Sequence, residues 1–114
     1  MKIEHYSFGK ITINGQSYTS DVIIYPDRVD ASWRRKEGHN LQAEDLKDIL
    51  NVKPDVLIIG TGAFGVMRVP KETMSSLELK GIKVRAMRTG KAVDLFNDLQ
   101  KDTTAVVAAL HLTC

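Results

Sequence analysis

Residues 55–62, Asp-Val-Leu-Ile-Ile-Gly-Thr-Gly, decide the fold class of this 114-residue chain. Val56 to Ile59 form a short, uninterrupted apolar run, which is typical of a strand that is buried on both faces. Gly60 and Gly62 follow at once and indicate a tight turn at the end of that strand. A doubly buried strand ending in a glycine turn predicts a layered α/β domain.

The residues that follow this stretch alternate between helix and strand patterns. Pro70 is typical of a first helical residue, and Gly81 of a residue just past a helix end. Between them, Met74 and Leu77 are expected to face the core. Ile82 to Met87 predicts a second strand, which would lie beside the first.

The last third of the chain repeats the pattern. Thr89 can cap a helix whose Ala92, Phe96 and Leu99 face the core. Ala105 to Leu112 predicts a final apolar strand. The resulting order, β-α-β-α-β, argues for a sheet with at least two adjacent parallel strands.

The residues that precede this stretch read as antiparallel β structure. Ile11 and Ile13 share a face immediately before Asn14-Gly15, a pair favoured by type I′ hairpin turns. Val22 to Tyr25 is an apolar run stopped by Pro26. The alternation of apolar and polar residues over positions 29–34 predicts a half-buried strand, and the polar residues 34–40 predict a loop.

Composition restricts the class of protein. Hydrophobic residues make up 43% and charged residues 26%, with a net charge of +2, so we expect one soluble domain over residues 1–114. No apolar run approaches the roughly 20 residues of a membrane span. A single cysteine excludes an intrachain disulfide and suits the cytoplasm. The even charge balance argues against nucleic acid.

Several segments together resemble a family of uncharacterised domains. They are Ile58 to Gly62, Met87-Arg88-Thr89 with Phe96-Asn97, and the final His111-Leu112-Thr113-Cys114. The family includes archaeal structural-genomics proteins, the adipogenesis-associated domain protein and a mitochondrial complex I assembly factor. The resemblance implies a three-layer α/β domain with a mixed central sheet, helices on its faces and an extra N-terminal β-hairpin layer. It implies no enzyme activity.

The segment Gly60-Thr61-Gly62-Ala63-Phe64-Gly65 fits the G-x-G-x-x-G pattern of dinucleotide-binding loops. In such loops a helix starts immediately, so that its N-terminus faces the phosphates. Here the helix start is delayed to Pro70, and no acidic residue stands where one would bind a ribose. A tight structural turn is therefore the preferred interpretation, with nucleotide binding as the alternative.

A second candidate is the turn Arg88-Thr89-Gly90-Lys91. Cations at a helix N-terminus add to the positive end of the helix dipole and to free backbone N–H groups, which favours anions. If the predicted strands at residues 56–59 and 82–87 are parallel neighbours, this turn and the Gly60 loop share one edge. We therefore predict a cleft there that accepts a phosphate, sulfate or carboxylate. The candidate residues are Gly60, Thr61, Gly62, Arg68, Arg88, Thr89 and Lys91.

His39, His111 and Cys114 form a possible reactive thiol cluster. In an extended strand His111 and Cys114 would lie about 10 Å apart and point to opposite faces, so no metal is expected. The alternative is a plain thiol without function.

No catalytic arrangement is evident, and no cofactor is expected. We predict a non-catalytic interaction or assembly module whose partner is another protein. The alternative is a binder of, or an enzyme acting on, a small anionic molecule at the Gly60 and Thr89 edge.

Overall fold

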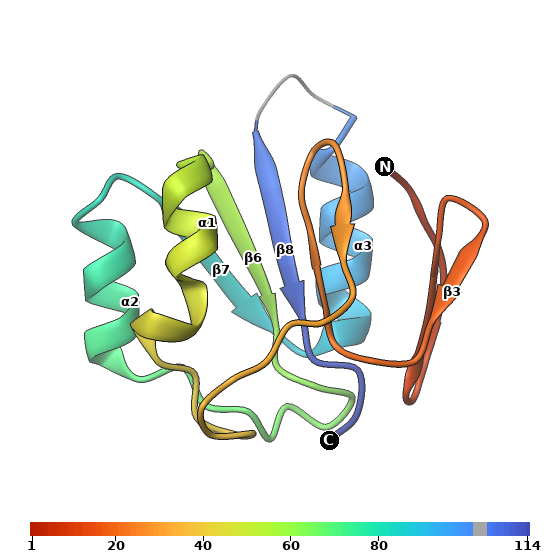
Figure 1. The fold of residues 1–114 in the computed structure, drawn as a ribbon, viewed down its shortest axis with the longest axis horizontal. Coiled ribbons are helices and arrows are strands. Elements are labelled where there is room, and N and C mark those ends of the chain that lie inside the picture. The colour runs from red at the N-terminus through yellow and green to blue at the C-terminus, as the bar shows by residue number, and fades with distance from the viewer. Residues whose placement is uncertain (102–104) are drawn as a thin grey trace.

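The computed structural model describes residues 1–101 and 105–114. A five-stranded mixed sheet forms its centre, in the order β5-β4-β8-β6-β7 (Figure 1). β7 and β8 lie on either side of β6 and run parallel to it, and β4 runs antiparallel to β8. The sheet strands are β4 (Val22–Ile24), β5 (Val29–Asp30), β6 (Val56–Gly60), β7 (Lys83–Met87) and β8 (Val106–Leu110).

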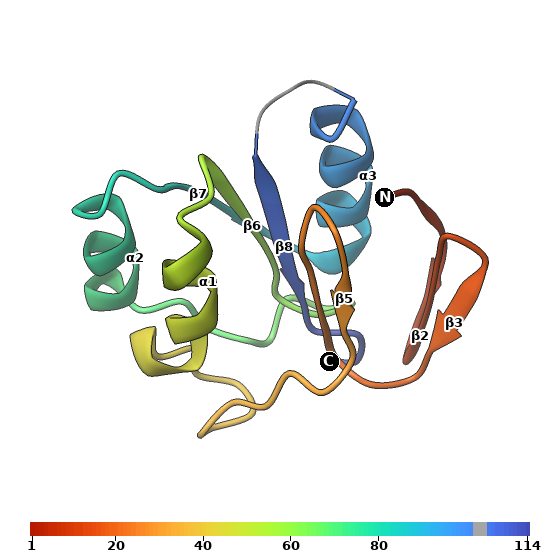
Figure 2. The same ribbon diagram turned by 45° about the horizontal axis from the view of Figure 1, so that its top comes forward.

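Helices cover both faces of this sheet, as Figure 2 shows in a second view. The 3-10 helix η1 (Ala43–Leu46) runs into α1 (Lys47–Val52), which lies with α2 (Lys71–Glu78) on one face. Helix α3 (Thr89–Leu99) lies on the other face. Two core clusters result, one on each face of the sheet. The predicted α/β architecture is confirmed.

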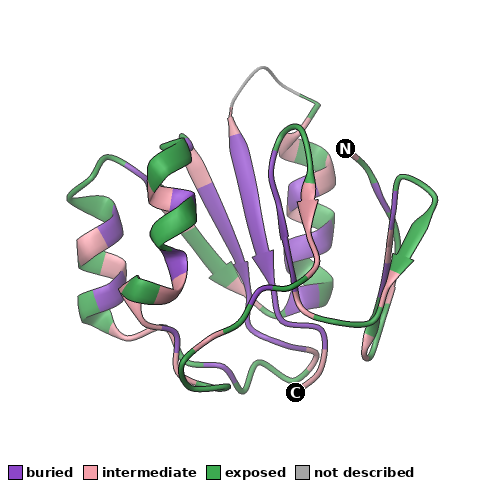
Figure 3. Ribbon diagram, in the orientation of Figure 1, coloured by how far each residue is buried: buried purple, intermediate pink, exposed green. Residues whose placement is uncertain are grey.

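The N-terminal residues form a separate layer. Strands β1 (Ile3–Ser7), β2 (Lys10–Ile13) and β3 (Gln16–Tyr18) make a three-stranded antiparallel sheet beside α3. Asn14 and Gly15 both have positive φ angles, 49° and 80°, which is the geometry of the predicted hairpin turn. Figure 3 shows buried residues concentrated in the central strands, whereas β3 is largely exposed.

Two local expectations were wrong. Strand β5 ends at Asp30 instead of continuing to Trp33, because the Asp30 carboxylate accepts hydrogen bonds from the N–H and hydroxyl of Ser32 and turns the chain. On α2, Thr73 is buried instead of Met74, which is only half-buried. The Thr73 hydroxyl donates to the carbonyl of Leu41, which satisfies its buried polar atom.

Candidate functional site

Three parallel strands end at one edge of the central sheet. Gly60, at the end of β6, lies in register with Met87 of β7 and Leu110 of β8. The loops that follow these strands therefore meet, and Figure 1 shows them together at the foot of the molecule near the C-terminal residue. We call this region the carboxyl edge. The Gly60 loop and the Arg88 turn do lie on one edge, as the parallel arrangement requires.

The glycine loop, residues 60–65, packs closely against other parts of the same chain. A Cβ on Gly60 would lie 2.8 Å from the Thr89 hydroxyl and 2.8 Å from a methyl of Leu110. At Gly62, where φ is +107°, a Cβ would overlap the backbone carbonyl of Cys114. These glycines therefore allow close approach of the chain's own backbone, which is one of the two uses of glycine in such loops.

The backbone N–H groups of the loop also have internal partners. The N–H of Thr61 donates to Met87 O at 2.8 Å, and that of Ala63 donates to Thr113 O at 2.7 Å. The N–H of Val66 donates to Cys114 O at 3.0 Å. A dinucleotide loop instead aims such groups at phosphates. The next helix begins only at Lys71, well beyond the loop.

Thr89 joins the loop to the C-terminal segment. It is fully buried, its hydroxyl donates to His111 O at 2.6 Å, and the same oxygen accepts from Gly62 N–H at 2.9 Å. The prediction that Thr89 caps α3 was wrong. Arg88 is the N-cap, and it makes no capping bond with its side chain. The Thr89 hydroxyl is instead committed to a tertiary contact that holds β6, α3 and β8 together.

The predicted cations at this edge are exposed. Arg68, Arg88 and Lys91 all project from the carboxyl edge, and a Cβ on Gly65 would lie 3.2 Å from Cγ of Arg88, so the Arg88 stem crosses the glycine loop. An anion at this edge would depend on these side chains and on the start of α3. The anion site stays a prediction.

A buried charged cluster lies beside the carboxyl edge. Asp21 precedes β4, His111 follows β8, and Arg35 comes from the loop after β5. Asp21 Oδ2 lies 2.8 Å from Arg35 Nη2 and 2.7 Å from His111 Nδ1, while Oδ1 accepts from Leu112 N–H at 2.8 Å. Arg35 Nε donates to Gly38 O. We call Asp21, Arg35 and His111 the buried cluster.

The electrostatics of this cluster favour an ionised Asp21. Burial raises the pKa of its carboxyl, but hydrogen bonds from His111, Leu112 N–H and Arg35 outweigh burial, so the pKa lies below its ordinary value. The guanidinium of Arg35 also stacks over the Trp33 ring, with 4.7 Å from Cζ to the centroid. The cluster therefore holds an ion pair that contacts both an imidazole and an indole.

Two of the three predicted thiol-cluster residues lie together. The rings of His39 and His111 are 5.6 Å apart and meet edge to face. Cys114 is half-buried, and its backbone carbonyl accepts a hydrogen bond from Val66 N–H. Across residues 1–101 and 105–114, no three His, Cys, Asp or Glu side chains are placed to share a metal ion. The reactivity of Cys114 stays a prediction.

Sequence reasoning missed Asp21 and Arg35. Asp21 stands alone between a serine and an apolar strand, and Arg35 belongs to a run of three cations that resembles a solvated loop. They are 14 positions apart in sequence, and the third member, His111, follows β8 near the other end of the chain. No local pattern could have joined them.

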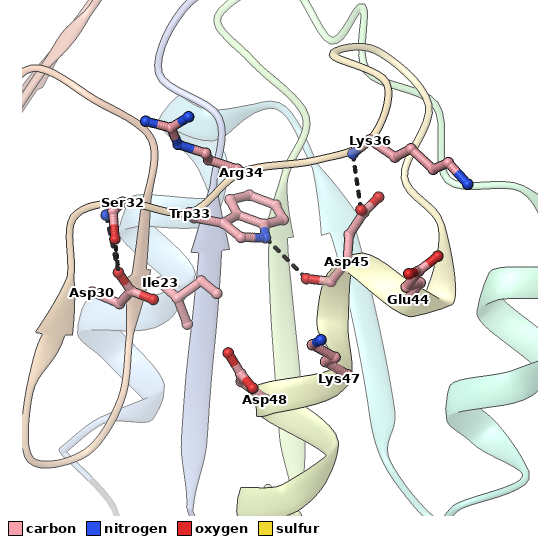
Figure 4. Close-up of a pocket in the computed structure, with 10 residues that line it drawn as sticks. All are labelled: Ile23, Asp30, Ser32, Trp33, Arg34, Lys36, Glu44, Asp45, Lys47 and Asp48. Atoms are coloured by element: carbon pink, nitrogen blue, oxygen red, sulfur yellow. Dashed lines mark hydrogen bonds between the residues drawn. The ribbon is translucent and has the colours of Figure 1, made fainter.

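A cleft of about 510 Å³ lies beside Trp33, between β5 and α1. Figure 4 shows the indole at its centre, with Nε1 donating to the carbonyl of Asp45 at 3.1 Å. The cleft is lined by Ile23, Asp30, Ser32, Trp33, Arg34, Lys36, Glu44, Asp45, Lys47 and Asp48. Both signs of charge are present, so the lining favours no single class of ligand.

An aromatic pair is exposed at the carboxyl edge. Phe8, in the turn between β1 and β2, is 56% exposed, and Phe64, in the glycine loop, is 65% exposed. Their ring centroids are 6.0 Å apart. Val66 is also exposed, and the Gly9 N–H donates to Leu112 O, which holds the first turn against the C-terminal segment. We call Phe8, Phe64 and Val66 the aromatic patch.

Comparison with known proteins places the fold. Residues 3–111 match the family model described as a protein of unknown function, DUF498/DUF598. A conserved hypothetical protein from Pyrococcus horikoshii is 30% identical, with a TM-score of 0.85 and full coverage of both chains. A structure titled as an outer membrane protein from Bartonella henselae is 30% identical, with a TM-score of 0.83 over 98% of this chain and 94% of that one.

A curated relative is the NADH dehydrogenase [ubiquinone] 1 alpha subcomplex assembly factor 3 of Xenopus tropicalis. It is 28% identical over 112 residues, which cover 96% of this chain. The chain spans 60% of the length of that relative. Within the described parts of this chain, no helix has the length and apolar character needed to cross a bilayer.

Proposed function

The chain belongs to the DUF498/DUF598 family, and we propose that it is a non-catalytic interaction module that docks a protein partner on the aromatic patch. The exposed Phe8 and Phe64 pair carries this proposal. Large aromatic side chains held together on a surface are typical anchors of protein interfaces, because they bury much area at low entropic cost.

Both rings are carried by turns whose backbones are hydrogen-bonded to the rest of the protein. Phe8 lies in a tight turn whose Gly9 has a φ of +77° and bonds to the C-terminal segment. Phe64 lies in a loop whose backbone is bonded to Thr113 and Cys114. Both turns therefore rest on the same segment, and a partner would meet a surface that is already formed.

The charges around the patch indicate the chemistry of the partner. Residues 8–10, 60–70 and 87–91 contain no aspartate or glutamate. They contribute four exposed cations, which are Lys10, Arg68, Arg88 and Lys91. A matching partner segment presents apolar anchors flanked by acidic side chains, because opposite potentials speed encounter and exclude wrong partners.

The relationship to an assembly factor supports a role of this type. The Xenopus relative is named for the assembly of an NADH dehydrogenase subcomplex, and such a role requires binding of other proteins. We extend to this chain only the capacity to bind a protein partner during assembly. We propose that it does so as a single domain in the cytoplasm. The rest of that relative lies outside the region aligned with this chain, so nothing is inferred from it.

The test cross-links three tagged proteins to their partners in the producing cell and compares the partners that each one recovers. They are the wild type, the double variant Phe8→Ser/Phe64→Ser, and the control Leu79→Ser. Leu79 is 87% exposed at the end of α2, away from the patch, so it matches the loss of an exposed apolar side chain. We expect recovery of the specific partner to fall about tenfold in the double variant and to persist in the control.

Two further measurements complete this test. Thermal unfolding checks that the double variant remains folded, since exposed substitutions usually change stability by only about 0.5 kcal/mol. Raising the salt concentration should lower the rate of association with the wild type. Equal recovery from all three proteins would show that the patch is not the docking surface.

A binder of a small anionic molecule at the carboxyl edge is the second candidate. The exposed Arg68, Arg88 and Lys91 favour it, because they lie at the same edge as the start of α3.

A further inference from the structure

Two polar atoms of the buried cluster lack a partner. Arg35 Nη1 and His111 Nε2 are both buried, and neither has a hydrogen-bond partner among the described residues. Their side chains are only 7% and 6% exposed. Buried polar atoms are nearly always satisfied, so two of them in one cluster require a specific explanation.

The bonds already present define what these two atoms can bind. His111 Nδ1 lies 2.7 Å from the Asp21 carboxylate and so carries a proton that it donates. Nε2 is then an acceptor in the neutral ring and a donor in the protonated ring. Arg35 has committed Nε to Gly38 and Nη2 to Asp21, so Nη1 is the remaining donor.

We propose that Arg35 Nη1 and protonated His111 Nε2 bind a small oxyanion, namely a carboxylate or phosphate group. Asp21 neutralises Arg35, so the cluster carries one net positive charge when His111 is protonated. A single negative charge on the ligand balances it, which removes the penalty of an unpaired buried charge. Guanidinium groups are well suited to oxyanions because their donors lie in one plane.

This geometry couples binding to proton uptake. With a neutral His111 the cluster offers one donor and one acceptor, whereas a carboxylate only accepts and needs two donors; a phosphate can instead use its own P–OH as a donor. The other titratable groups that face the cluster are His39, whose ring contacts that of His111, and Tyr6, whose hydroxyl donates to Leu112 O. Neither supplies a second negative charge. Binding of a carboxylate therefore requires His111 to hold a proton on both ring nitrogens.

His39 contacts the ring of His111. It is the exposed member of the group, and it belongs to the loop of residues 36–40. Trp33 covers another side of Arg35 and is itself buried. An anion would enter by displacing the His39 ring, which is in contact with His111 edge to face. The site is separate from the aromatic patch, and it does not depend on the protein-docking role.

The experiment titrates the wild type with inorganic phosphate and, separately, with acetate. Calorimetry is performed at about pH 6 and about pH 8, in two buffers that differ in ionisation enthalpy. We expect one proton-linked site, at which acetate binding takes up about one proton and weakens from the lower to the higher pH. Tighter binding of phosphate or of acetate identifies the preferred oxyanion.

Three variants locate the site. Arg35→Lys keeps the charge but removes the planar fork, and we expect about tenfold weaker binding. His39→Ala leaves the buried cluster intact and should speed association. Arg88→Ala/Lys91→Ala removes charges of the carboxyl edge, so it should weaken only the separate phosphate binding expected there and leave the proton-linked binding at His111 in place. Histidine NMR of the wild type, in which Nε2 of His111 should shift on anion addition, requires no variant to fold.

Several results would overturn the proposal. One is an unshifted His111 Nε2 resonance at millimolar anion, which would mean that an internal water satisfies both atoms. Another is binding without proton uptake. A third is binding that Arg35→Lys leaves intact and Arg88→Ala/Lys91→Ala abolishes.

Discussion

Two loops of this protein show how little the residue pattern of a loop says about what the loop contacts. The loop of residues 60–65 has the glycine spacing of a ligand-binding loop, yet its glycines and N–H groups pack against Thr89 and the last two residues. The loop of residues 34–40 resembles ordinary solvated surface, yet it supplies Arg35 to the buried cluster and places His39 against the His111 ring. A glycine permits the close approach either of a ligand or of another part of the chain, and the motif does not distinguish between them.

The largest expected effect tests whether the loop of residues 34–40 contributes a structural ion pair through Arg35. Asp21→Asn leaves the Arg35 guanidinium without its counter-ion, and we expect a loss of about 3–5 kcal/mol in the free energy of unfolding at neutral pH. Chemical denaturation measures it. If the loss is under about 1 kcal/mol, the cluster is not a structural ion pair.

The pH dependence of that effect follows from the pKa of Asp21. Burial raises this pKa, but the bonds from His111, Leu112 and Arg35 lower it further, to below its ordinary value. Such a group stabilises the protein above its unfolded pKa, and the contribution is lost as pH falls through the native one. The gap between wild type and Asp21→Asn should therefore close on acidification below about pH 4.

A somewhat smaller effect tests the packing of the first loop. Gly62→Ala places a methyl against the carbonyl of Cys114, at a φ of +107° that other residues rarely adopt. We expect a loss of about 2–4 kcal/mol, which combines strain and overpacking. Gly38→Ala is the matched control, since nothing lies within 4 Å of its Cβ position. Equal stability of the two variants would show that the loop is open, as in a ligand-binding loop.

The smallest effect concerns anion binding at the carboxyl edge. Because the loop N–H groups donate internally, phosphate should bind there only weakly, through exposed side chains. The double variant Arg88→Ala/Lys91→Ala should lose about 0.3–1 kcal/mol of binding per removed charge, measured by calorimetry at low salt. Strong phosphate binding that this variant abolishes would restore the glycine loop as the main ligand site.

Much of the architecture could be predicted because its signals are local. Periodicity located β6 to β8 and helices α2 and α3, and Asn14-Gly15 marked a hairpin turn that the structure confirms. The short β5 and the buried face of α2 could not be predicted in the same way. Ser32 and Thr73 each made a hydrogen bond whose partner sequence periodicity does not reveal.

The sequence by itself determined the α/β layering, the separate hairpin layer and the edge at which three parallel strands end. These follow from hydrophobic pattern and turn residues, which act over a few positions. Only the tertiary structure decided which groups meet at that edge. Asp21, Arg35 and His111 come from three distant segments, and β8 brings the last of them beside the first through its pairing with β4. Charges separated this far in sequence find each other only through strand order, because nothing local encodes their contact.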